Sequence, residues 1–230
     1  MNAVALPGKL LLCIYTCEAD RFYLEQLQAT QFYARINAAE SIDILEVFAD
    51  PSLPKPVLQG RQLTLNCPEE YRSLSIKTQA MLRYCYAHLA FDYLLKLDCT
   101  LVDYARRPSH RTGEQIRRIF NLDTVERLIF DPAFYASEYI GLYWQRATRD
   151  GVEQWARVKG LPPLDGDRIF GDRRELSYYA GKFYAIGRRF CGFIADYGQA
   201  IAEEHQRMLN GSEDLMVGRL YERYRQHDQS

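Results

Sequence analysis

Residues Phe91 to Thr100 have the sequence FDYLLKLDCT, which carries the clearest fold signal in the chain. The apolar run from Tyr93 to Leu97 is typical of a strand that is buried on both faces. It stops at Asp98, and open α/β sheets bind their ligands beyond the carboxyl ends of the strands. Asp98 is therefore a candidate binding residue, although an aspartate in this position also serves as an ordinary turn residue.

The segments before this strand alternate between strand and helix patterns. A buried strand is predicted over residues 9–15, an alternating strand over 41–48 and a short strand over 62–65. Helices are predicted over residues 19–35 and 68–90, and the second opens on a proline and two acidic residues that suit a first helical turn. This alternation predicts an α/β fold with a mainly parallel central sheet flanked by helices.

The segments after the strand are more charged and less regular. Residues 108–160 are predicted to be helical, with pieces over 112–120, 123–130 and 152–158. We treat residues 105–165 as a helical insertion to which the sequence assigns no role.

The last part of the chain returns to clear strand and helix signals. The predicted elements are a loop over residues 161–167, a strand pair or a bent strand over 175–186, and a helix over 188–209. Asn210-Gly211 then suits a left-handed helix end. Ser212 suits the cap of a final helix that runs towards His227. No repeat or linker interrupts the pattern, so a single domain over residues 1–230 is expected.

The composition is that of an ordinary globular protein. The 230 residues include 29 lysines and arginines against 30 acidic residues, which gives a formal net charge of -1. Such a chain has no general attraction for nucleic acid, so no nucleic-acid partner is expected. The six cysteines show no Cys-x-x-Cys spacing and are predicted to be reduced. Because the sequence has neither an apolar run of about 20 residues nor a signal peptide at its start, a cytoplasmic location is expected.

Four motifs follow one another along the chain. They are YRSLSIKT at 71–78, YLLKLDCT at 93–100, YAGKFYAIG at 179–187 and EDLMVG at 213–218. Together they resemble the β1,3-galactosyltransferase and Fringe-like glycosyltransferase family. That family has a Tyr-x-Asn-Leu-Thr-x-Lys-Thr helix, a Lys-x-Asp-Asp-Asp strand end, a Tyr-x-x-Gly-x-x-Tyr segment and a Glu-Asp-Val-x-x-Gly helix start. The resemblance implies a GT-A-like, Rossmann-like fold.

The resemblance also implies an inverting glycosyltransferase. Such an enzyme transfers a sugar from a UDP-sugar donor to a hydroxyl group of a glycan or a lipid-linked acceptor. Asp98 matches the first aspartate of the family's metal motif and is expected at the nucleotide. Asp214 matches the family's general base and is expected to remove the acceptor proton. We expect a hexosyltransferase of polysaccharide biosynthesis. Peripheral association with a membrane is compatible with this function.

The metal motif departs from the family pattern. Cys99 and Thr100 stand where the family has its second and third aspartates. Mn²⁺ and Mg²⁺ prefer carboxylate oxygens, so a divalent cation bound through Asp98 is in doubt. Either Asp103 or His227 would have to complete the site.

The alternative to a metal is a cationic clamp on the diphosphate of the donor. Lys77, Lys96 or Arg188 would then face the phosphate groups. Arg21, in the turn after the first strand, and Thr100 are further candidates for donor binding.

The remaining candidates concern substrate binding next to the base. Gly181 is expected where the backbone approaches a ligand closely. Tyr179 and Tyr184 are expected to stack on a sugar, with cross-strand packing as the alternative. Glu213 is expected beside Asp214, where its charge would raise the pKa of that aspartate.

The loss of the metal aspartates supports a second hypothesis. The chain would then be a catalytically inactive, glycosyltransferase-like protein that binds a nucleotide or a glycan. Both hypotheses require that Asp98 and Asp214 face a common groove, and they differ in whether Asp214 supports turnover.

Overall fold

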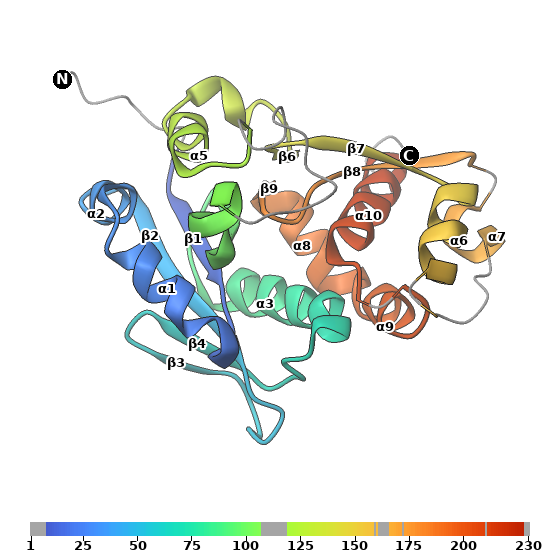
Figure 1. The fold of residues 1–230 in the computed structure, drawn as a ribbon, viewed down its shortest axis with the longest axis horizontal. Coiled ribbons are helices and arrows are strands. Elements are labelled where there is room, and N and C mark those ends of the chain that lie inside the picture. Colours follow the sequence, from blue (N-terminus) through green and yellow to red (C-terminus); the bar gives the residue numbers. More distant parts are fainter. Residues whose placement is uncertain are drawn as a thin grey trace.

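The structure is a computed structural model, and it describes residues 8–106, 119–158, 160, 166–171, 173–209 and 211–227. Its centre is a seven-stranded sheet in the order β3-β4-β2-β1-β5-β9-β6, with helices on both faces (Figure 1). The predicted α/β class is thereby confirmed.

Parallel strands form the middle of this sheet. They are β1 (Leu10–Tyr15), β2 (Ile42–Ala49), β4 (Gln62–Leu65) and β5 (Tyr93–Asp98). β1 pairs with β2 and β5, and β2 pairs with β4. Every residue of β1 is buried, as expected for a central strand that is covered on both faces.

Antiparallel strands form both edges, so the sheet is mixed. They are β3 (Val57–Gln59), which pairs with β4, β9 (Phe183–Gly187), which pairs with β5, and β6 (Tyr139–Gly141), which pairs with β9. The register of β5 and β9 sets Lys96 opposite Tyr184. This pairing brings the 179–187 motif alongside the 93–100 motif.

The helices cover two hydrophobic cores, one on each face of the sheet. One core lies under α1 (Arg21–Gln28), α2 (Gln31–Asn37) and α5 (Leu122–Ile129). The other lies under α3 (Leu74–His88), α8 (Arg188–Tyr197), α9 (Gln199–Met208) and α10 (Glu213–His227). Neighbouring residues of β1 enter opposite cores, Leu12 the first and Cys13 the second, because side chains alternate along a strand.

The segment between β5 and β8 is helical only in part. The predicted pieces 123–130 and 152–158 are confirmed as helices, but the segment also contains strands that we did not predict. Besides α5 it contains β6, β7 (Trp144–Thr148), α6 (Arg149–Val158) and α7 (Gly166–Phe170). β7 pairs with β8 (Glu175–Tyr179) in a separate antiparallel sheet of two strands. The sequence pattern did not reveal β7 because Ala147 is its one buried residue.

Parts of two predictions lie outside the described residues. These are most of the predicted helical piece 112–120 and the first part of the loop 161–167, whose last residues begin α7. Short 3₁₀ helices cover Glu18–Asp20, Tyr71–Ser73, Cys99–Arg106 and Pro132–Tyr135.

Two predicted helices are each divided in two. The helix over 19–35 breaks at Thr30, whose hydroxyl accepts a hydrogen bond from the Tyr33 N–H at 3.1 Å and so caps α2. The helix over 188–209 breaks at Gly198, where an added Cβ would collide with the Ile194 carbonyl oxygen.

The predicted left-handed helix end is confirmed at Gly211. This glycine has a φ of 71°, and its N–H donates to the His205 carbonyl oxygen at 3.0 Å. Within the parts of the chain that the structure describes, no helix combines the length and apolar character needed to cross a membrane.

Candidate functional site

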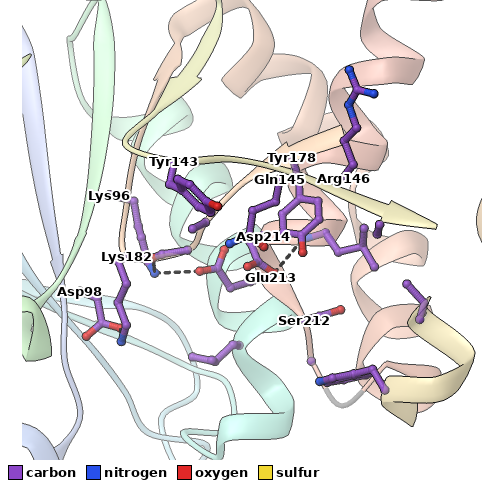
Figure 2. A pocket seen from close by; sticks show the side chains of 18 of the residues that line it. Lys96, Asp98, Tyr143, Gln145, Arg146, Tyr178, Lys182, Ser212, Glu213 and Asp214 are labelled. Carbon is purple, nitrogen blue, oxygen red and sulfur yellow. Dashed lines mark hydrogen bonds and ion pairs between the residues drawn. The ribbon is translucent and has the colours of Figure 1, made fainter. Parts of the chain in front are cut away.

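A pocket of about 580 Å³ opens where β5 ends and α10 begins (Figure 2). Asp98, the last residue of β5, and Asp214, in the first turn of α10, both line it. Gly181 and Lys182 line it from the turn between β8 and β9. Tyr71 and Leu74 line it from the motif at 71–78. All four motifs therefore meet at one cavity, at the carboxyl edge of the parallel strands.

The Asp98 carboxylate has protein partners on both oxygens. Oδ1 accepts hydrogen bonds from the Thr100 N–H at 2.9 Å and from the Thr100 hydroxyl at 2.7 Å. Oδ2 forms an ion pair with Lys182 Nζ at 2.5 Å, and this ammonium also donates to Thr100 Oγ1 at 2.9 Å. Asp98 is thus both the turn residue and the pocket residue that the sequence left as alternatives.

The ammonium groups near Asp98 keep its carboxylate ionised. Burial by itself would raise the pKa of Asp98, but Lys182, Lys96 and the Thr100 hydroxyl stabilise the charged form and lower the pKa to about 2. The Asp98 and Lys182 side chains are 24% and 29% exposed. The Asp98 carboxylate is therefore ionised at neutral pH, and the ion pair is accessible to a ligand in the pocket.

Beneath the pocket surface, Glu213 and Lys96 form a buried ion pair. Lys96 Nζ lies 2.8 Å from Glu213 Oε1 and also donates to the Gly181 carbonyl oxygen. The Tyr184 hydroxyl donates to Glu213 Oε2 at 3.0 Å. An added Cβ at Gly181 would collide with the Glu213 carboxylate, so glycine allows this close approach. The pair joins β5, β9 and the β8–β9 turn to the start of α10.

Asp214 has a different electrostatic environment from Asp98. Its Oδ1 accepts a hydrogen bond from the Leu215 N–H at 2.8 Å. Burial and the charge of the neighbouring Glu213 raise the pKa of Asp214 to about 6, although backbone hydrogen bonds and Lys96 act in the opposite direction. A carboxylate with this pKa is mostly ionised at neutral pH and is basic enough to accept a proton in catalysis.

The two aspartates are expected to affect stability in opposite directions. Because the pKa of Asp214 is raised, its ionisation destabilises the folded state, and Asp214→Asn should raise the free energy of unfolding by roughly 1–2 kcal/mol at neutral pH. This gain should vanish as the pH falls to about 4. Because the pKa of Asp98 is lowered, Asp98→Asn should cost roughly 1–2 kcal/mol at neutral pH, and the difference should shrink as the pH falls from about 4 towards 2.

Urea unfolding at a series of pH values measures both effects. Asp43→Asn is the matched control, because Asp43 is exposed and pairs with Lys9 far from the pocket. A loss of stability in Asp214→Asn at neutral pH would contradict the raised pKa.

The segment to which the sequence assigned no role supplies another wall of the pocket. Gln145 and Arg146 line it from β7, and Trp155 lines it from α6. Tyr143 precedes β7, and Tyr178 comes from β8 (Figure 2). Burial and the charge of Asp214 raise the pKa of Tyr178, so this ring lies close to the carboxylate. Our sequence analysis missed the part of this wall that comes from β7 and α6.

Three predicted cations do not line the pocket and have structural partners instead. Lys77 is buried and pairs with Glu69. Arg21 pairs with Glu18 on the surface. Arg188 donates to backbone carbonyl groups at the end of α3. The cationic clamp suggested by the sequence is therefore reduced to Lys96, which is held by Glu213.

Four further predicted residues also lie outside the lining. Thr100 is buried, and its hydroxyl donates to Asp98 Oδ1 instead of facing a ligand. Tyr179 follows Tyr178 on β8 and faces the other way, with its ring centre 5.1 Å from that of Tyr139. Tyr184 is fully buried and supports Glu213 rather than facing a ligand. The His227 ring, at the end of α10, packs 6.1 Å from that of Phe193.

The residues around Asp98 do not fit a divalent cation. Thr100 donates to one carboxylate oxygen and offers no carboxylate of its own, while the Lys182 ammonium holds the other oxygen. Neither Asp103 nor His227 lines the pocket. Among the described residues, no group of three or more His, Cys, Asp or Glu side chains is arranged to hold a metal ion.

Lys182 is the main site residue that our sequence analysis missed. It follows Gly181 within the 179–187 motif, and a charged residue next to a turn glycine was the available signal. That signal was weak, because an exposed turn lysine is common.

The comparisons with known proteins add no family to this description. No protein-family model matches the chain, and a search of curated proteins found no relative. A function must therefore be argued from the pocket and the four motifs.

Proposed function

We propose that the protein is an inverting glycosyltransferase with a GT-A-like fold, which transfers a sugar from a UDP-sugar to a hydroxyl group of a glycan or lipid-linked acceptor. The observation that carries the proposal is that Asp98 and Asp214 line the same pocket. The Asp98 carboxylate is held ionised, and Asp214 has a pKa of about 6. These properties suit a donor-binding carboxylate and a general base, respectively.

The donor would bind at the Asp98 end of the pocket. An ionised carboxylate there can accept hydrogen bonds from ribose hydroxyl groups. The rings of Tyr104 and Phe120 also line the pocket and offer apolar surface for the base.

The acceptor would bind between Asp214 and the wall formed by β7 and α6. Tyr143, Trp155 and Tyr178 offer rings of the kind that pack against the C–H faces of sugars. Gln145 adds an amide that can both donate to and accept from sugar hydroxyl groups.

In the proposed reaction, Asp214 accepts the proton of the acceptor hydroxyl group. The acceptor oxygen forms a bond to the anomeric carbon of the donor sugar from one face. The bond between this carbon and the phosphate oxygen breaks on the opposite face, and UDP leaves with the electron pair. The configuration at the anomeric carbon is therefore inverted.

Nucleotide binding tests the donor half of the proposal. The wild-type protein should bind UDP in isothermal titration calorimetry. Asp98→Asn should weaken this binding by about 10- to 100-fold, because a charge-assisted acceptor is lost. Asp43→Asn, at an exposed pair remote from the pocket, should bind UDP normally. A wild-type protein that binds neither UDP nor any UDP-sugar would contradict the proposal.

The second candidate function is the binding of a nucleotide or glycan without turnover. The Asp98–Lys182 ion pair favours this function, because the pair occupies the place of the family's metal-binding aspartates. A catalytically inactive protein would bind a nucleotide or glycan in this pocket without turnover. A panel of UDP-sugars, offered with glycan and lipid-linked acceptors, separates the two functions. UDP release by the wild type above the level of Asp214→Asn indicates an enzyme, and binding without release indicates a binding protein.

A further inference from the structure

The proposed function requires a cation that stabilises the diphosphate of the donor. We propose that Lys182 is this cation and that it replaces a divalent metal, so that the pocket binds and cleaves a nucleoside diphosphate sugar without Mn²⁺ or Mg²⁺. This inference rests on the proposed function and names the cation of the same site.

The backbone fixes Lys182 beside Asp98. The Asp98 N–H donates to the Lys182 carbonyl oxygen at 3.0 Å, which extends the pairing of β5 with β9 by one step. The side chains meet as well, since Lys182 Nζ lies 2.5 Å from Asp98 Oδ2 and 2.9 Å from Thr100 Oγ1. The lysine is therefore held at the end of β5 by main-chain and side-chain contacts together.

The Lys182 ammonium keeps a donor for a ligand. An ammonium group has three N–H donors, and Asp98 and Thr100 take two of them. Among the described residues, no third hydrogen bond of this ammonium is found, and the side chain is 29% exposed at the pocket wall. Nζ also lies 5.8 Å from the centre of the Tyr104 ring. A phosphate group that enters the pocket can take the third donor without breaking the ion pair.

The other described cations of the pocket are less suitable. Lys96 is 4% exposed, and Glu213 and the Gly181 carbonyl hold its ammonium. Arg146 comes from β7, on the wall away from β5, and its Nη1 lies 3.3 Å from Glu175 Oε1. Among the residues that the structure describes, Lys182 is therefore the accessible positive charge next to Asp98.

A lysine at this position can supply what the metal supplies in the family pattern. When the bond between sugar and phosphate breaks, negative charge grows on the leaving diphosphate. A fixed ammonium stabilises that charge electrostatically, and lysine binds phosphate as a compact point charge. Lys182 transfers no proton in this step, and the electron pair leaves with UDP.

Calorimetry with UDP and uridine tests this inference. The wild type should bind UDP equally well in EDTA and in Mn²⁺. Lys182→Met should weaken UDP binding by about 10- to 100-fold and leave uridine binding unchanged, because uridine has no phosphate group. Lys182→Arg should retain most of the UDP affinity. Lys55→Met, at an exposed loop lysine, is the matched control and should bind UDP normally.

A second pair of variants isolates the phosphate contact from the loss of the ion pair. Lys182→Met also leaves the Asp98 charge unpaired. The same substitution is therefore made in the Asp98→Asn protein, which has no such charge. The double variant should bind UDP more weakly than Asp98→Asn alone. UDP binding by the wild type that requires Mn²⁺ would overturn the inference. So would a folded Lys182→Met protein with wild-type UDP affinity, or one that loses uridine and UDP affinity alike. If the wild type binds UDP under neither condition, the proposed function itself fails, and the inference fails with it.

Discussion

Asp214→Asn is expected to lower kcat for sugar transfer by about 10²–10⁴-fold while UDP affinity stays unchanged. Asparagine has nearly the same shape as aspartate, and its side-chain oxygen can still accept the hydrogen bond from the Leu215 N–H. It cannot accept the proton of the acceptor hydroxyl group. The loss would therefore fall on the chemical step and not on donor binding.

The pH dependence adds a second readout for the same residue. In the wild type, kcat/KM should rise with pH through about 6, because Asp214 must be ionised to act as a base. The residual activity of Asp214→Asn should lack this step. Asp196→Asn, on the exposed side of α8, is the control and should keep the wild-type profile. Full turnover by Asp214→Asn would remove Asp214 from the mechanism.

Glu213→Ala is expected to lower the free energy of unfolding by about 3–5 kcal/mol, the usual cost of removing one partner of a buried ion pair. The substitution leaves the Lys96 ammonium buried beside the Gly181 carbonyl, with its charge uncompensated by Glu213. It also removes the acceptor of the Tyr184 hydroxyl group, which is fully buried. The cost therefore combines an unpaired charge with an unsatisfied donor.

Urea unfolding measures this cost, and two further variants define its origin. Replacement of both charged residues, by Lys96→Met with Glu213→Leu, should recover much of the stability, because no buried charge is then left unpaired. Glu18→Ala breaks the exposed pair with Arg21 and should change the stability little. If Glu213→Ala lowered the free energy of unfolding as little as Glu18→Ala, the prediction would be contradicted, and water would have to hydrate the Lys96 ammonium.

The local sequence pattern was sufficient to predict the main elements of the central sheet. The runs that became β1 and β5 are largely apolar, and those that became β2 and β4 mix apolar with polar residues in the way of strands. Turn residues bound them, so each could be identified without its partners. The end of a helix could also be predicted from its own residues. Gly211 ends α9 with a left-handed conformation, because the requirement for positive φ is local to that residue.

Contacts between distant segments could not be predicted in this way. Asp98 was identified as a candidate because it ends a strand, but its partner Lys182 depends on the antiparallel pairing of β5 with β9. Likewise, Glu213 was expected beside Asp214, but its ion pair with Lys96 required the start of α10 to meet β5. The periodicity of a segment reports which of its faces is buried and says nothing about what covers that face. The aspartates that define the pocket could thus be found in the amino-acid sequence. The lysines that affect the pKa values of these aspartates, and the wall opposite them, depend on how the strands and helices assemble.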